Sequence, residues 1–349
     1  MLDVTSIDLR RRTHMVERRK ERLDRGIKVR TEGIYAISSW QGIAYALLPT
    51  FSFVVGMLII PLVVPSMTWQ RIMTISCIFA LLALSFDFLA HFVGIICLGG
   101  AFFTGVGGYV SGVLNSAFGL PMVITIPIAT IVGGVICTLF LLPCLPIRGI
   151  YFAIVSLMYP LLFARVIQAL ELFGGTDGLP GLATFPNIWV ELYFIIPMTL
   201  ILTFALRRLV NEDFGIVLRA IKDNDQAVRA SNINITWYKT KAVFLGAAIG
   251  CFAGACLAHL YGWVGLSLFA LDFSIFPIAA TVVGGVGTLV GPILGAFILA
   301  PLSEMLRAFG PLRVVFYSLI LAGLVVFKTE GLMPFLQRKY HQFERWTEI

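Results

Sequence analysis

Residues 214–243 read FGIVLRAIKDNDQAVRASNINITWYKTKAV, a polar stretch in an otherwise apolar chain. The 349 residues are 58% hydrophobic and 13% charged, against roughly 25% charged in an ordinary soluble domain, and the mean hydropathy is +0.92. On both sides of the stretch the chain returns to apolar runs of about twenty residues, the length that a helix needs to cross a bilayer. The stretch is therefore a connection between membrane spans.

The apolar runs determine the fold class. Lipid offers the backbone no hydrogen-bond partner, so each crossing is a helix or part of a closed barrel. The runs here are long and continuous, whereas barrel strands alternate over about ten residues. We expect an all-α polytopic membrane protein with about 8–10 transmembrane helices, including glycine-interrupted or re-entrant segments.

The charges between the runs predict the topology. The expected spans are the apolar runs at 42–65, 72–90, 97–116, 121–143, 150–172, 188–206 and 241–264, a broken segment at 275–306 and a last run at 314–329. The loop 207–241 is rich in Lys and Arg, whereas 173–187 has neither. Because basic loops remain in the cytoplasm, we predict that the N-terminus and the loop 207–241 are cytoplasmic. A cytoplasmic C-terminal tail requires an even number of crossings after the loop 207–241. The broken segment is therefore expected to contribute two pieces.

We divide the chain into a basic cytoplasmic extension at 1–40, a membrane domain at 41–330 and a cytoplasmic tail at 331–349. Residues 1–35 hold ten Lys or Arg and six Asp or Glu, without the apolar core of a signal peptide. Two alternatives stay open for this extension, a helix on the membrane surface and a solvated charged helix.

Composition argues against several function classes. The net charge of +7 is spread between the apolar runs and at the two ends, as topology signals are, so we expect no nucleic-acid partner. The four histidines lack metal-ligand spacing, and we expect no metal. The cysteines form no CxxC pair and are expected to be small buried side chains; they are Cys77, Cys97, Cys137, Cys144, Cys251 and Cys256.

Two glycine-rich stretches occupy comparable places in the two halves, LGGAFFTGVGGY (98–109) and VGGVGTLVGP (283–292). Paired glycine-interrupted segments indicate a transport path near the middle of the membrane. The alternative is close helix packing through small residues, and both can hold together. The candidate path residues are Asp87, Gly94, Gly99, Gly100, Gly284, Gly285 and Gly287.

The polar stretch has helical periodicity. Phe214, Val217, Leu218, Ile221 and Val228 fall within about 100° on a helix of about 3.6 residues per turn, which predicts a short amphipathic helix on the membrane surface. Asp225 interrupts the apolar face, so we expect two short helical pieces rather than one.

The ends of this helix also have sequence signals. Asn211, Glu212 and Asp213 are candidate N-caps, and the asparagines of SNIN (231–234) favour a helix end. An ordinary solvated connection remains the alternative to a functional surface.

The stretch resembles the cytoplasmic coupling loop of permeases from branched-chain amino-acid ABC transporters of the LivM type. Further segments resemble the same family in the same order; they are ALSFDFLAHFVGIICLGGAFFTGVGGY (83–109), GGTDGLPGL (174–182), VVGGVGTLVGPILGA (282–296) and EGL (330–332). The resemblance covers residues 70–335 and leaves the first forty residues without a counterpart.

The resemblance implies a non-catalytic subunit of an ATP-driven uptake system in a bacterial inner membrane. Its implied partners are a second, LivH-type permease, two ATPase subunits and a periplasmic or surface solute-binding protein. The chain lacks a GxxxxGK[ST] loop, so ATP and Mg²⁺ are expected in the partner ATPase. The candidate ATPase-coupling residues are Phe214, Gly215, Leu218, Arg219, Ile221, Lys222, Asp223 and Arg229.

The implied cargo is a branched-chain or hydrophobic amino acid, and urea or a short amide is the alternative within the same family. The family usually has a glutamine, a serine and a histidine where this chain has Ile95, Cys97 and Gly100. If this segment lines the path, these departures disfavour a strongly hydrogen-bonded solute.

Asp87 also departs from the family, which usually has asparagine there. A carboxylate inside the membrane normally faces the bundle interior. It is either a contact in the path or a structural partner of a polar group such as Arg165.

Thr176 and Asp177 in the external loop are candidates for docking the solute-binding protein. A rigid connection, with Asp177 capping its own turn, is the alternative.

Two further function classes are alternatives to an ABC permease. A secondary transporter would couple to an ion through Asp87, and an intramembrane enzyme would use His91 or His259 as a base. Neither histidine has a nucleophile nearby in the sequence, and His91 follows Asp87 by one helical turn.

Overall fold

The computed structural model describes residues 56–57, 66–147, 149–306, 315, 319, 322–323, 331–336 and 338, all within one compact unit, Val54–Ile349. The extension 1–40 and nearly all of the expected spans 42–65 and 314–329 lie outside the described residues.

Helices form almost the whole described chain. The α-helices are α3 (Met67–Asp87), α4 (Gly100–Phe118), α5 (Met122–Leu141), α6 (Ile150–Ala169), α7 (Ile188–Asn211), α8 (Asp213–Asp223), α9 (Asp225–Ala230), α10 (Ile235–Tyr261), α11 (Asp272–Gly284) and α12 (Gly291–Met305). A π-helical turn, Phe88–Val93, extends α3, and the short 3₁₀ turns are Leu142–Cys144, Leu172–Gly174 and Leu266–Phe269.

Five helices in the described part of the chain are long and apolar enough to cross a membrane, in the segments Met67–Val93, Met122–Cys144, Ile150–Ala169, Ile188–Asn211 and Ile235–Tyr261. The expected all-α, multi-pass membrane architecture is confirmed. The total of 8–10 crossings stays a prediction, because two of the expected spans lie outside the described residues.

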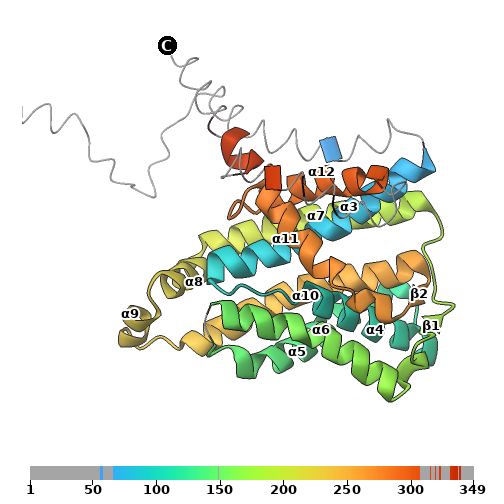
Figure 1. Cartoon of the computed structure of the whole chain (residues 1–349), viewed down its shortest axis with the longest axis horizontal. Helices are drawn as coiled ribbons and strands as arrows, with labels where there is room; N and C mark the ends of the chain where they lie inside the picture. Colours follow the sequence, from blue (N-terminus) through green and yellow to red (C-terminus); the bar gives the residue numbers. More distant parts are fainter. Residues whose placement is uncertain are drawn as a thin grey trace, which may run out of the picture. The chain divides into compact units, whose positions relative to one another are not determined.

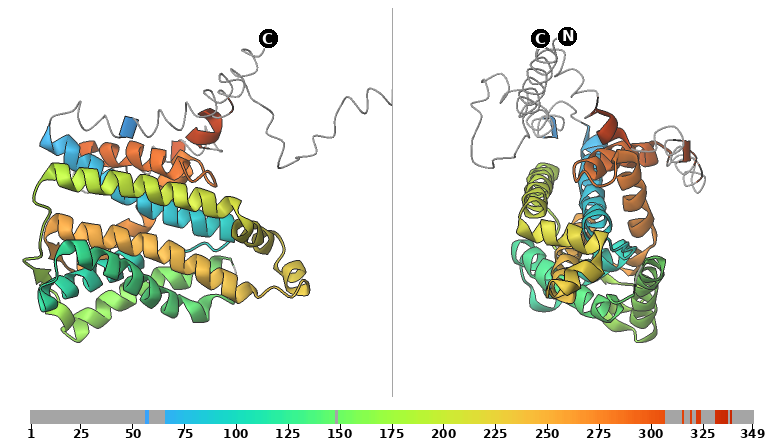
Figure 2. Two further views of the ribbon diagram at one scale, coloured as in Figure 1. Left: turned by 180° about the vertical axis from the view of Figure 1, so that it is seen from behind. Right: turned by 90° about the vertical axis from the view of Figure 1, so that its left-hand side faces the viewer.

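Two of these five long helices are mostly buried in this unit. In their most apolar stretches, 78% of residues are buried in Met67–Val93 and 83% in Ile235–Tyr261, against 28% in Ile150–Ala169. Helix α10 packs along α4 and α5, whereas α3 packs along α7, α11 and α12 (Figure 1). The remaining long helices therefore lie around α3 and α10, as the two further views in Figure 2 show.

Small residues allow α4 and α10 to approach closely. A Cβ added at Gly107 would overlap the Cys251 backbone, and one added at Gly254 would overlap the Thr104 backbone. The predicted interruption of the stretch 98–109 is therefore wrong after Gly100, because those residues lie in the continuous helix α4. Here the packing alternative is confirmed, since the missing side chains bring two backbones together.

The second glycine-rich stretch does break the chain. Helices α11 and α12, 13 and 15 residues long, pack side by side and are joined by residues 285–290, which we call the hairpin loop. Gly285 and Gly287 have φ of 113° and 75°, which glycine adopts without the cost of a side chain. The expected division of 275–306 into two short pieces is confirmed, and the re-entrant character of either piece stays a prediction.

The connections gather at two opposite ends of the bundle (Figure 1). Helices α8 and α9 lie at one end, and the antiparallel pair of strands β1 (Leu179–Pro180) and β2 (Trp263–Val264) lies at the other. The alternation agrees with the topology predicted from the basic loops. Which end faces the cytoplasm stays a prediction.

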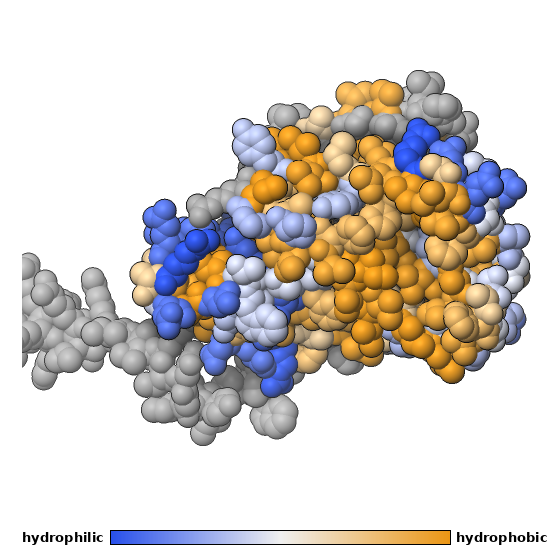
Figure 3. Space-filling model, turned by 90° about the horizontal axis from the view of Figure 1, so that it is seen from below, coloured by the Kyte–Doolittle hydropathy of each residue, from blue (hydrophilic) through white to orange (hydrophobic). Residues whose placement is uncertain are grey.

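The outer helices expose apolar side chains. Figure 3 shows a broad hydrophobic face with hydrophilic residues towards its ends. Large exposed residues of α5 and α6 include Ile131, Val135, Leu139, Ile154, Leu161 and Leu162. Such a surface fits lipid or another apolar membrane subunit.

Candidate functional site

The polar stretch folds as two short helices, α8 and α9, as predicted. The break lies at Asn224, one residue before Asp225, because the Asn224 side-chain oxygen accepts from the amides of Gln226 at 3.1 Å and Ala227 at 3.2 Å. Asn232 has φ of 60°, so the left-handed end expected in SNIN is confirmed.

The expected side-chain N-cap of α8 is wrong. Asn211 is still part of α7, Glu212 occupies the cap position without a side-chain bond, and Asp213 is already in the first turn. A carboxylate in that turn still interacts favourably with the helix dipole.

The apolar face of α8 is covered by its own chain. Leu218 is 0% exposed and Ile221 3% exposed. Ile221 belongs to a cluster whose members are Val217, Val228, Ile233, Ile235 and Tyr238. These residues therefore hold the connection against the bundle and do not face a partner.

Two other predicted coupling residues also have internal contacts. A Cβ on Gly215 would overlap the Val210 backbone, and the Phe214 ring stacks on Tyr238 with centroids 5.7 Å apart. Only the exposed side of α8 and α9 can meet another protein.

This exposed side carries Arg219, Lys222, Asp223 and Arg229. It also carries Ile216, which is 59% exposed and was not among the predicted coupling residues. We call the exposed residues Ile216, Arg219, Asp223 and Arg229 the outer face.

Two basic residues tie α8 to the π-helical turn. Lys222 Nζ donates to the His91 carbonyl at 2.8 Å, and the Arg219 guanidinium lies 5.5 Å from the centroid of the Phe92 ring. Gly94 has φ of 77°, and a Cβ there would lie 2.9 Å from Lys222 Cγ. The glycine thus provides both the backbone conformation and the space that this contact needs.

Asp87 is fully buried behind the same turn. One carboxylate oxygen accepts from the Gly287 amide at 2.7 Å and the other from the Leu289 amide at 3.2 Å. His91 Nδ1 lies 3.0 Å from Asp87 Oδ1 but is not aligned for a hydrogen bond. Asp87 therefore holds the hairpin loop.

Arg165 is not the structural partner of Asp87 that the sequence suggested. Its guanidinium is exposed and donates to Gln168 Oε1 at 2.9 Å within α6. The actual partners of Asp87 are backbone amides, which sequence patterns do not reveal.

The candidate path glycines lie in separate places. Gly284, Gly285 and Gly287 lie at the hairpin loop that Asp87 holds, whereas Gly94 ends the π-helical turn beside Lys222. Gly99 lies beside Cys97 and Ser156, whereas Gly100 lies against the Phe273 backbone. Their role in transport remains a prediction.

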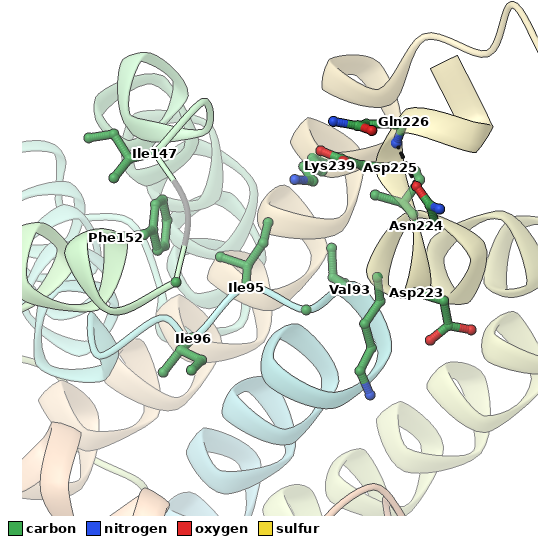
Figure 4. A pocket seen from close by; sticks show the side chains of 14 residues that line it. Val93, Ile95, Ile96, Ile147, Phe152, Asp223, Asn224, Asp225, Gln226 and Lys239 are labelled. Atoms are coloured by element: carbon green, nitrogen blue, oxygen red, sulfur yellow. Dashed lines mark hydrogen bonds between the residues drawn. The ribbon is translucent and has the colours of Figure 1, made fainter. Parts of the chain in front are cut away.

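A cavity of about 400 Å³ lies between the α8–α9 junction and the residues that follow the π-helical turn (Figure 4). Its polar side includes Asp225, Gln226 and Lys239, and its apolar side includes Ile95 and Phe152. It adjoins the Lys222 contact, so α8, the 94–96 segment and the α5–α6 connection share one end of the bundle.

Thr176 and Asp177 are exposed at the opposite end. The Asp177 carbonyl accepts from Trp263 Nε1 at 3.0 Å, and a Cβ on Gly178 would overlap the Val264 carbonyl. In the described part of the chain, the Asp177 side chain makes no hydrogen bond to its own turn. These contacts support a rigid connection, and docking remains a prediction.

His259 is a buried junction that sequence reasoning missed. Its Nδ1 donates to the Ala183 carbonyl at 2.7 Å, since a carbonyl only accepts. In the neutral imidazole Nε2 is then the acceptor, and it lies 2.9 Å from the Ser111 and Thr125 hydroxyls. All three side chains are 0% exposed, so this serine–histidine pair joins helices and offers no access to a substrate.

Glu191 was also missed. It is 5% exposed in the first turn of α7, and its Oε1 has no hydrogen-bond partner among the described residues. The only sequence signal for a buried acid here was the position of Glu191 at the start of an apolar run.

The chain matches the protein family described as "Branched-chain amino acid transport system / permease component" over residues 69–328. It is 26% identical to the high-affinity branched-chain amino acid transport system permease protein LivM of Salmonella typhimurium, covering 81% of this chain and 74% of the relative. The Escherichia coli protein of the same name is 25% identical over the same shares.

A probable branched-chain amino acid transport permease protein LivM of Methanocaldococcus jannaschii is 26% identical, covering 68% of this chain and 77% of the relative. No solved structure matches the chain. The family match spans the long apolar helices, the hairpin loop and the α8–α9 connection. The chain therefore belongs to the permease component family of branched-chain amino acid transport systems.

Proposed function

We propose that this chain is the permease subunit of an ATP-driven ABC uptake transporter and docks a partner ATPase on the outer face of α8 and α9. One observation carries the docking proposal. A charged, exposed helix face, anchored by its own buried apolar side, lies between two membrane-crossing helices, α7 and α10. A partner that moves α8 thereby moves both of those helices.

The remaining subunits follow from the same proposal. A second, LivH-type permease packs against the exposed apolar helices and completes the path. ATP and Mg²⁺ bind in two ATPase subunits at the α8–α9 end, which is cytoplasmic, as is the N-terminus. A solute-binding protein docks at the opposite end near Thr176 and Asp177, on the outside of a bacterial inner membrane.

The proposed cargo is a branched-chain or similarly hydrophobic amino acid, because relatives named as branched-chain amino acid permeases match most of the chain. Urea or a short amide is the alternative. Ile95 and Cys97, where the family usually has polar residues, are 7% and 3% exposed. Neither side chain replaces the hydrogen-bonding groups that the family usually has, which favours a hydrophobic solute if this segment lines the path.

An ion-coupled secondary transporter acting through Asp87 is less well supported. Both carboxylate oxygens already accept from backbone amides. An ion at this position would compete with two hydrogen bonds that hold the hairpin loop.

The test substitutes residues of the exposed outer face, because a charge at the buried Leu218 or Ile221 would disrupt the fold of the connection. We expect the double variant Ile216→Glu and Arg229→Glu to release the ATPase subunit and to lower uptake at least about tenfold, the loss of a central contact. Co-purification and uptake are measured at equal membrane levels.

The matched control is Asp177→Lys at the opposite end, which also changes a charge on an exposed residue. It retains the ATPase, although uptake falls if Asp177 docks the binding protein. Normal ATPase recovery with the double variant would contradict the docking proposal.

A further inference from the structure

We propose that Asp87 is a positioning residue that transmits movement of α8 to the hairpin loop between α11 and α12. This inference rests on the proposed function, in which a partner ATPase moves α8. It adds the route by which that movement reaches a part of the bundle that does not adjoin α8 in the sequence.

The first link joins α8 to the π-helical turn Phe88–Val93. Lys222 donates to the His91 carbonyl at 2.8 Å, and Arg219 lies over the Phe92 ring at 5.5 Å. The two contacts hold adjacent residues of the turn from one helix face. A displacement of α8 therefore displaces the turn.

The second link lies within the turn itself. A π-helical turn is rare and often marks a functional position. Asp87 directly precedes this turn, which Gly94 closes in the left-handed conformation. The Ile95 amide donates to the Leu89 carbonyl at 2.9 Å. This bond fixes the end of the turn to its beginning, two residues after Asp87.

The third link crosses from α3 to the hairpin loop. Asp87 accepts from the amides of Gly287 and Leu289 at 2.7 Å and 3.2 Å, 200 and 202 residues away in the sequence. Hydrogen bonds to a buried carboxylate are stronger than neutral ones. Each oxygen holds a different amide, so the carboxylate fixes both the position and the orientation of the loop.

The hairpin in turn contacts the start of α4. Ser274 Oγ in α11 accepts from the Ala101 amide of α4 at 2.9 Å. Thr281 Oγ1, also in α11, donates to the Ala83 carbonyl of α3 at 3.2 Å. Movement of the loop thus reaches the region where Gly99 and Gly100 begin α4, in the interior of the bundle.

A purely structural brace makes a different prediction from a transmitting residue. Loss of a brace lowers the amount of folded transporter but leaves the remaining molecules normal. Loss of a transmitting residue leaves the ATPase docked while the hairpin loop no longer responds to nucleotide.

The experiment measures that response on the complete transporter, with its partner subunits, in lipid nanodiscs. Val286 in the hairpin loop is 39% exposed, and all six native cysteines are buried. We introduce Val286→Cys and measure its rate of labelling by a water-soluble maleimide, without nucleotide and with the ATPase trapped by ATP and vanadate. This readout needs no identified cargo.

In the parent, the transporter that carries only Val286→Cys, we expect nucleotide to change the labelling rate about fivefold. This is the lower end of the range typical of allosteric coupling. Asp87→Ala and Lys222→Met remove the two ends of the route and should abolish the change. Asp87→Asn keeps one acceptor oxygen and should keep part of it. Lys222 is exposed, so its variant tests the route even if Asp87→Ala fails to fold.

The matched controls lie outside the route. Lys241→Met removes a basic side chain that lies over the Trp237 ring, and Ser76→Ala removes a buried hydroxyl bonded within α3. Both should keep the response.

An unchanged response in Lys222→Met, or in Asp87→Ala where that variant folds, or no response in the parent, would overturn the inference. Failure of the ATPase to co-purify with the parent would instead count against the proposed function.

Discussion

The two glycine-rich stretches look alike in the sequence but have opposite structural roles. Residues 98–109 lie mainly in the continuous helix α4, where Gly107 meets the backbone of α10. Residues 283–292 end one helix, form the hairpin loop and begin another, with Gly285 and Gly287 at positive φ. Glycine acts through its missing side chain in the first stretch and through its backbone freedom in the second.

The largest expected effect comes from filling the first contact. Gly107→Val places a side chain against the Cys251 backbone, which cannot shift without separating α4 from α10. We expect a loss of about 3 kcal/mol in stability, seen as a large fall in Tm of the purified protein in detergent. Val132→Leu on the 41% exposed position of α5 is the control, and an equal Tm in both variants would refute close packing at Gly107.

A smaller effect is expected in the hairpin loop. Gly287→Ala retains space, since the nearest atom to a new Cβ is His91 Cβ at 3.8 Å, but forces alanine to φ of 75°. The strain costs about 1–2 kcal/mol, so the protein folds with a moderately lower Tm and a displaced loop. We expect uptake to fall more than the amount of folded protein.

Gly119→Ala is the control for that variant. Gly119 has φ of 62° with nothing within 4 Å of an added Cβ, so it has similar backbone strain far from Asp87. If both variants reduce uptake equally, the hairpin loop has no special role in transport.

The smallest effect on stability is expected at Gly99. An added Cβ would lie 3.4 Å from Cys97 Sγ and 3.5 Å from the Ser156 carbonyl oxygen, ordinary contact distances. Gly99→Ala should change stability by less than about 0.5 kcal/mol, while uptake falls if Gly99 lines the path. Tm and uptake of the same preparation are compared, and unchanged uptake would remove Gly99 from the path.

Local patterns predicted much of the fold. Apolar length located the long helices, and the interrupted periodicity predicted α8 and α9. The charge pattern placed 207–241 and 173–187 at opposite ends, which the structure supports through α8, α9 and the β1–β2 pair.

Long-range contacts were beyond such patterns. An amphipathic helix has one apolar face, but its sequence does not say whether that face meets the same chain or another one. Leu218 and Ile221 were therefore predicted as partner contacts and are buried in their own chain. The same limit hid the Asp87–Gly287 bond and the pairing of His259 with Ser111, 148 residues away.

Site-directed crosslinking from the outer face tests the central proposal most directly. A photoreactive residue at Ile216 in the complete transporter should crosslink to the ATPase subunit, whereas the same residue at Thr176 should not. Crosslinking of the ATPase from Thr176 and not from Ile216 would place the hydrolysing subunit at the other end of the bundle and contradict the proposed mechanism.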